Sequence, residues 1–140
     1  MENDLILQKL EKLRFYVERI EEKTPVSSDL LSQDLDSQDI IVLNLERAIQ
    51  ECVDIALHII SDDDSVPVPD TMAQAFLTLR QMKILSQNTA EKLAKAVGFR
   101  NIAVHAYQQI DWKIVYQIIT TQLDDFRTFA REITTNKKSF

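Results

Sequence analysis

The sequence predicts an all-α fold, an antiparallel bundle of four to five helices in one domain spanning residues 1–140. One observation behind this is the single glycine, with three prolines, in a chain of 140 residues. A β-sandwich, a barrel or a Rossmann unit needs many more glycines for its turns, so the composition favours long helices and few loops. The other is that apolar residues, 45 % of the chain, recur every three or four positions, as on one face of a helix.

The first helix is expected over residues 3–23. Asn3 or Asp4 is expected to be its N-cap, and Thr24-Pro25 ends it. Its apolar stripe consists of Ile6, Leu10, Leu13, Val17 and Ile20. A short turn around residues 29–33 is expected to follow.

The second helix is expected to begin near Asp36-Ser37 and to reach about Ser61, with acids in its first turn that suit the helix dipole. It carries two apolar stripes side by side, namely Ile41, Leu45, Ala48, Cys52, Ile55 and Ile59, and Val42, Ile49, Val53, Ala56 and Ile60. A helix that is apolar over so wide an arc packs on two sides, so we expect it at the centre of the bundle. A surface loop of acids and prolines follows over residues 62–69.

A third, shorter helix is expected after this loop. Asn88 is expected to cap the fourth, with Glu91 as its acidic partner three residues on. Gly98 is expected to interrupt that helix. Asp111 is then expected to cap one last long helix, whose apolar stripe runs to about residue 133.

The bulk properties favour a cytoplasmic protein without a membrane anchor. No run approaches the roughly 20 apolar positions of a membrane span, and the first residues are acidic where a signal peptide would be basic. A single cysteine, Cys52, excludes an internal disulfide and any CxxC metal or redox motif.

The net charge of −6 is unevenly distributed. Residues 71–110 carry five basic side chains and one acid, Glu91, and the acids dominate elsewhere. A local basic stretch on an acidic body is compatible with a nucleic-acid partner. Chance clustering on a solvated face explains it equally well.

The segment with the most chemistry is residues 98–107, Gly-Phe-Arg-Asn-Ile-Ala-Val-His-Ala-Tyr. On an ideal helix Arg100 and Tyr107 share a face to within about 20°, whereas His105 points about 140° away from Arg100. One straight helix therefore does not aim the arginine and the histidine at the same point. Either Gly98 changes the course of the helix, or a second copy of the helix completes the site, which predicts a dimer.

These residue types suit the cleavage of RNA without a metal ion or other cofactor. A neutral imidazole can take a proton from a ribose 2′-hydroxyl or return one to the leaving 5′-oxygen. A guanidinium forks onto two phosphate oxygens and stabilises the extra charge of the transition state, and Asn101 can orient either group. On composition alone, a single helical histidine is more often a structural residue.

The segment from Arg100 to Tyr107 resembles the Arg-x4-His-x-Tyr signature of the HepT branch of HEPN proteins, and the resemblance extends over nearly the whole chain. It implies a HEPN-like bundle and a homodimeric, metal-independent endoribonuclease toxin of a type VII toxin–antitoxin system. It also implies an MntA-type nucleotidyltransferase as antitoxin. Carried over, Arg100 and His105 are the catalytic pair, Asn101 supports them, and Tyr107 is the residue to which the antitoxin transfers AMP from ATP.

Three residues of the second helix have open roles. Glu51 and Asp54 fall where the family carries acids, and they either support the site or stabilise neighbouring side chains. His58 lies one turn after Asp54, so a surface Asp–His pair is expected rather than a second catalytic histidine.

Two other functions remain open. The chain could be a non-catalytic helical dimerisation or substrate-binding partner of a nucleotidyltransferase, although Arg100 and His105 together favour an enzyme. Direct nucleotide binding ranks third because Gly98 is the only glycine and no phosphate-binding loop can form.

Overall fold

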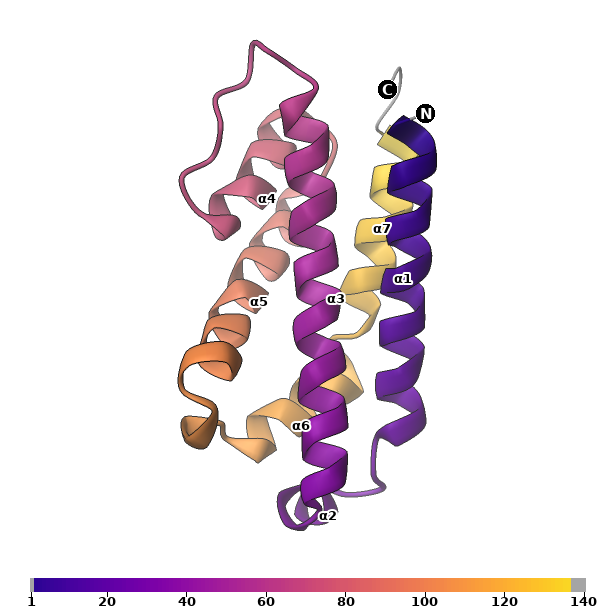
Figure 1. The fold of residues 1–140 in the computed structure, drawn as a ribbon, viewed down its shortest axis with the longest axis vertical. Coiled ribbons are helices and arrows are strands. Elements are labelled where there is room, and N and C mark those ends of the chain that lie inside the picture. The colour runs from indigo at the N-terminus through magenta and orange to yellow at the C-terminus, as the bar shows by residue number, and fades with distance from the viewer. Residues whose placement is uncertain (1, 137–140) are drawn as a thin grey trace.

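The computed structural model describes residues 2–136, and these form an all-helical bundle without strands (Figure 1). The elements are α1 (Glu2–Lys23), α2 (Ser28–Gln33), α3 (Leu35–Ser61), α4 (Met72–Gln81), α5 (Gln87–His105), a 3₁₀ turn η1 (Tyr107–Gln109), α6 (Trp112–Thr121) and α7 (Asp124–Asn136). The predicted all-α class is confirmed, and the bundle has more, shorter helices than expected. None of these helices is long and apolar enough to cross a membrane.

The long helix α3 stands at the centre of the bundle, as its two apolar stripes predict. Helices α1 and α7 pack on one side of it, and α4 and α5 pack on the other (Figure 1). The short helices α2 and α6 meet at the end of the bundle where α3 begins. Every residue of both stripes is buried, so α3 connects the two halves of the core.

Two helix starts differ from the predictions. Helix α1 already includes Glu2, so Asn3 and Asp4 lie within its first turn instead of capping it. Helix α3 starts at Leu35, because the side chain of Asp34 accepts hydrogen bonds from the backbone N–H groups of the next turn, at 3.1 and 3.3 Å. The turn expected around residues 29–33 is the short helix α2.

Helix α5 begins one residue before the predicted cap. Ser86 is the N-cap, and its hydroxyl accepts a hydrogen bond from the backbone N–H of Thr89 at 3.2 Å, so the prediction of Asn88 is wrong. A contact from a distant part of the chain accounts for the shift. Glu132 of α7 accepts hydrogen bonds from the backbone N–H of Ser86 at 2.8 Å and from the Thr89 hydroxyl at 3.0 Å.

Gly98 does not interrupt α5, which runs without a break from Gln87 to His105. Its φ is not positive, and a Cβ built at Gly98 would meet nothing within 4 Å. A glycine inside a helix costs about 1 kcal/mol relative to alanine. The burial of Leu93, Val97 and Ala103 on the same helix outweighs that cost.

The expected last helix is two helices, α6 and α7, with Gln122 and Leu123 between them. Asp111 caps α6 as predicted, with its carboxylate 3.0 Å from the N–H of Lys113. The break follows Thr120 and Thr121, whose hydroxyls donate to carbonyls one turn back at 2.7 and 2.6 Å. β-Branched residues and such back-bonding weaken a helix, so the chain can change direction here although the apolar stripe continues.

Candidate active site

The motif occupies the C-terminal end of α5 and the start of the 3₁₀ turn that follows it. The N-terminal half of α5 is anchored to α7 through Glu132, and buried side chains hold its middle against the core. His105 is the last residue of α5, and Tyr107 opens the 3₁₀ turn that follows. The start and the middle of α5 are therefore fixed by α7 and by the core, and the end of α5 presents polar side chains to solvent.

Arg100 continues the row that faces the core. It lies three residues after buried Val97 and is half-buried, and its Nε is enclosed without a hydrogen-bond partner. No carboxylate lies within ion-pair distance of it among the described residues. A buried donor on an unneutralised guanidinium is costly unless an acceptor arrives, and a phosphate oxygen is such an acceptor.

Asn101 and His105 are exposed, and the part of the chain that the structure describes provides no hydrogen-bond partner for either side chain. Because α5 is continuous, Arg100 and His105 are five positions apart on a regular helix, which places them about 140° apart around the axis. A change of course at Gly98 is excluded. Within one chain the two side chains therefore do not converge.

Tyr107 is the one motif residue held by a hydrogen bond to a distant side chain. Its hydroxyl donates to Oδ1 of Asp39, on α3, at 2.6 Å, and its ring meets the ring of Trp112 edge-on, with centroids 6.0 Å apart. Burial, and then the hydrogen bond and the negative charge of Asp39, raise the pKa of Tyr107 to about 12. Tyr107 is therefore protonated at neutral pH.

Exposed apolar side chains surround the motif. Ile102 and Val104 of α5 are 44 % and 42 % exposed, and Ile114 of α6 is 53 % exposed. Exposed apolar side chains of this size are typical of surfaces at which proteins associate.

Glu51 and Asp54 are paired with α1. Lys9 lies 3.5 Å from Glu51, which is buried, and 3.9 Å from Asp54, whose carboxylate also accepts from Gln50 Nε2 at 2.9 Å. Neither acid contacts a motif residue through a hydrogen bond or ion pair among residues 2–136. The packing of α1 against α3 explains these two acids.

The expected pair between Asp54 and His58 is not formed. The carboxylate of Asp54 bonds Gln50 and Lys9 instead, in the direction of α1 and the preceding turn. The Nε2 of His58 is buried without a partner. An i, i+4 spacing permits such a pair, and the competing amide and ammonium donors prevent it here.

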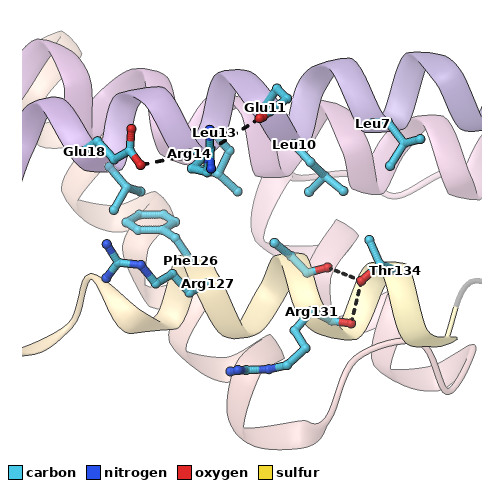
Figure 2. Close-up of a pocket in the computed structure, with 12 residues that line it drawn as sticks. Leu7, Leu10, Glu11, Leu13, Arg14, Glu18, Phe126, Arg127, Arg131 and Thr134 are labelled. Atoms are coloured by element: carbon cyan, nitrogen blue, oxygen red, sulfur yellow. Dashed lines mark hydrogen bonds and ion pairs between the residues drawn. The ribbon is translucent and has the colours of Figure 1, made fainter.

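One hollow of the described surface lies between α1 and α7 and contains no motif residue. It measures about 510 Å³, and leucines of α1 face Phe126 of α7 across it (Figure 2). Its rim carries both signs of charge, for example Glu11 and Glu18 beside Arg14 on α1. A mixed rim does not match the uniform negative charge of an RNA backbone.

Another hollow, about 400 Å³, lies between α3, α5, α6 and α7 and includes basic residues of α5. Lys92 and Lys95 line it together with Phe99, the residue before Arg100. Asp125 pairs with Lys92 at 3.4 Å, which leaves Lys95 as the less neutralised charge. Part of the basic stretch seen in the sequence thus lies along the helix that leads to the motif.

The described residues contain no group of three or more His, Cys, Asp or Glu side chains that could hold a metal ion. The motif supplies a guanidinium, an amide, an imidazole and a phenol, and the carboxylate of Asp39 lies beside the phenol.

An all-helical bundle with an arginine and a histidine on its fifth helix is typical of HEPN proteins. Comparison with known proteins shows to which family of them this chain belongs. The sequence pattern described as "Ribonuclease HepT-like" matches residues 13–133. The mRNA nuclease HepT of Shewanella oneidensis is 35 % identical over 127 residues, which are 91 % of this chain and 94 % of the relative. The tRNA nuclease HepT of Aphanizomenon flos-aquae is 29 % identical over 129 residues, 92 % of this chain and 87 % of the relative.

Comparison with solved structures also finds a toxin of this kind. The tri-AMPylated Shewanella oneidensis HEPN toxin, in complex with its MNT antitoxin, superposes with a TM-score of 0.87 at 32 % identity, over 95 % of this chain and 98 % of that one. This chain belongs to the HepT-like ribonuclease family. The predicted family, the fold class and the function as an endoribonuclease toxin are thereby confirmed.

Sequence reasoning missed Asp39. It lies 68 residues before Tyr107 and has no motif around it. Only the packing of the end of α5 beside the start of α3 brings the two side chains together, so no pattern of spacing could have identified this contact.

Proposed function

We propose that two copies of this chain together form the ribonuclease site, in which Arg100 of each copy acts together with His105 of the other, so that a dimer holds two such pairs. The observation that carries this proposal is the continuity of α5, which turns the two side chains away from each other within a chain. The exposed apolar residues around the motif supply a surface for the contact between copies. The unneutralised Arg100 and the free His105 are both available for an RNA phosphate.

In the proposed reaction, His105 takes the proton of a ribose 2′-hydroxyl, and the 2′-oxygen attacks the adjacent phosphorus. The bond from phosphorus to the 5′-oxygen then breaks, and the leaving oxygen receives a proton from an imidazolium. Arg100 holds two phosphate oxygens and stabilises the charge that develops on them, while Asn101 orients the phosphate. The mechanism requires a 2′-hydroxyl, so it predicts cleavage of RNA and not of DNA.

We further propose that the chain is a cytoplasmic toxin whose antitoxin is an MntA-type nucleotidyltransferase that transfers AMP from ATP to Tyr107. Three solved structures support this assignment: a tri-AMPylated HEPN toxin in complex with an MNT antitoxin, a toxin–antitoxin structure with AMP-PNP, and a toxin–antitoxin structure that includes MntA. Tyr107 is partly exposed and lies two residues beyond His105, so a nucleotide on its hydroxyl occupies space close to His105. The added phosphate also competes with RNA for the guanidinium.

The decisive experiment compares the two histidines of the chain. We expect His105→Ala to lower the rate of RNA cleavage at least 100-fold or so, in line with the loss of acid–base catalysis, with unchanged helicity and unchanged sedimentation. His58→Ala is the matched control and is expected to cleave normally, because His58 lies on α3 and forms no hydrogen bond or ion pair with a motif residue. Normal cleavage by His105→Ala would remove this residue from the mechanism and favour the non-catalytic alternative.

A further inference from the structure

We propose that Asp39 is the proton acceptor for the modification of Tyr107, so that the toxin supplies a catalytic group for its own neutralisation. This inference rests on the proposed transfer of AMP to Tyr107. It concerns a residue of α3 that lies outside the Arg-x4-His-x-Tyr motif and has no part in the proposed cleavage of RNA.

The geometry already has the form of a nucleophile paired with its base. The hydroxyl oxygen of Tyr107 lies 2.6 Å from Oδ1 of Asp39, within the reach expected of a general base and the proton it removes. Trp112 packs edge-on against the tyrosine ring and fixes its direction. The hydroxyl therefore points at the carboxylate before any nucleotide arrives.

The carboxylate of Asp39 is free to act as a base. It is exposed, and among residues 2–136 no lysine, arginine or histidine pairs with it and no hydrogen bond other than that of Tyr107 reaches it. A cation at this position would hold the carboxylate in its ionised form and weaken it as a proton acceptor.

The ionisation of Tyr107 shows why a base is needed. With a pKa of about 12, roughly one hydroxyl in 10⁵ is ionised at pH 7, so a preformed phenolate is too rare to be the main nucleophile. The proton must leave as the bond to phosphorus forms. Asp39 is the one described side chain that accepts a hydrogen bond from this hydroxyl.

The step balances with a nucleoside triphosphate as co-reactant. The tyrosine oxygen attacks the α-phosphorus, and the new oxygen–phosphorus bond replaces the bond from the α-phosphorus to the bridging oxygen. Pyrophosphate leaves with the electron pair of that bond, and the hydroxyl proton passes to the carboxylate of Asp39 and then to water. No oxidant or reductant is involved.

The same contact makes Asp39 specific for the first nucleotide. The ester oxygen formed on Tyr107 has no proton to donate, and the ionised carboxylate then faces a negative phosphodiester, so the hydrogen bond cannot form again. Any further AMP unit is joined to a hydroxyl of the preceding nucleotide, which is not the group that Asp39 contacts. Asp39 therefore controls the start of a chain and not its extension.

The test follows the intact mass of the purified full-length toxin over time with its cognate nucleotidyltransferase, ATP and Mg²⁺. Asp39→Asn keeps an oxygen that can accept the hydroxyl but removes the base, and we expect it to slow the first addition about 100-fold or more. Asp39→Glu restores a carboxylate and is expected to recover much of the rate. Asp36→Asn removes the same charge one turn earlier on α3, from a carboxylate that accepts no hydrogen bond from Tyr107, and is expected to react as the unaltered toxin does.

The outcomes separate the inference from the function on which it rests. If the unaltered toxin gains AMP on Tyr107 and Asp39→Asn gains it at the same rate, Asp39 is not the proton acceptor. If the unaltered toxin gains no AMP, or Tyr107→Phe gains as much, the proposed modification of Tyr107 itself is wrong. Circular dichroism and thermal unfolding of each variant check the fold, and a slow Asp39→Asn with native helicity, rescued by Asp39→Glu, supports the inference.

Discussion

Replacing Glu132 by alanine removes the carboxylate that holds the first turn of α5 against α7. The backbone N–H of Ser86 and the hydroxyl of Thr89 both donate to it, at 2.8 and 3.0 Å. The Ser86 hydroxyl lies 3.1 Å from the same carboxylate and 3.0 Å from the Thr89 oxygen, and its single proton can serve only one of them at a time. Two full hydrogen bonds and a shared one are thus lost.

The size of the effect follows from the exposure of these groups. A hydrogen bond to a charged group contributes about 1.5–3 kcal/mol. Ser86 is exposed, so water replaces part of its bond, whereas Thr89 is 3 % exposed and its hydroxyl is left with only Ser86 nearby. We expect Glu132→Ala to lower the free energy of unfolding by about 2–3 kcal/mol and the midpoint temperature by roughly 6–9 °C. Glu132→Gln keeps one acceptor oxygen and is expected to lose about half as much.

Thermal and urea unfolding followed by circular dichroism measure this series. Glu22→Gln is the control, because Glu22 is exposed on α1 and has no hydrogen bond or ion pair in the described part of the chain. It is expected to unfold as the unaltered protein does. A Glu132→Ala protein as stable as the Glu22→Gln protein would refute the view that this carboxylate anchors the helix that carries the motif.

Three further changes test other features of the fold. Gly98→Ala is expected to raise the free energy of unfolding by about 0.5–1 kcal/mol, because the glycine is helical and its Cβ position is open; a loss of stability would mean that another group occupies this space. Lys83→Gly is also expected to stabilise, by up to about 1 kcal/mol, since Lys83 has a φ of 65° at the end of α4; a lower midpoint in urea would contradict this. Cys52 is fully buried and burial raises its thiol pKa, so it is expected to resist a thiol reagent until the protein unfolds; fast labelling of the native protein would show that the core opens.

Local signals in the sequence predict most of the architecture. The double stripe of α3 predicts a central helix, and the pair Thr24-Pro25 predicts the end of α1. The wrong predictions concern helix ends, where contacts with distant residues or hydrogen bonds from side chains to the backbone determine where a helix begins or stops. Ser86 becomes the cap of α5 because Glu132 lies beside it, and the last helix divides because threonine hydroxyls bond the backbone.

In the candidate site, too, the sequence predicts what is local and misses contacts between distant residues. The sequence alone identifies four site residues, because they lie within one motif of eight residues: Arg100, Asn101, His105 and Tyr107. The partner of Tyr107 could not be found in this way, because Asp39 belongs to another helix 68 residues earlier. Likewise, i, i+4 spacing predicts a pair between Asp54 and His58. The carboxylate of Asp54 instead accepts a hydrogen bond from Gln50 and pairs with Lys9 of another helix.

Mixing two inactive variants shows whether Arg100 and His105 act across two copies of the chain. Arg100→Ala and His105→Ala are expected to be inactive alone. After exchange of subunits, half of the dimers are mixed, and each mixed dimer holds one intact pair contributed by different chains, so activity is expected to return to about a quarter of normal. If no activity returns although mass spectrometry demonstrates subunit exchange, the two residues do not work across the dimer.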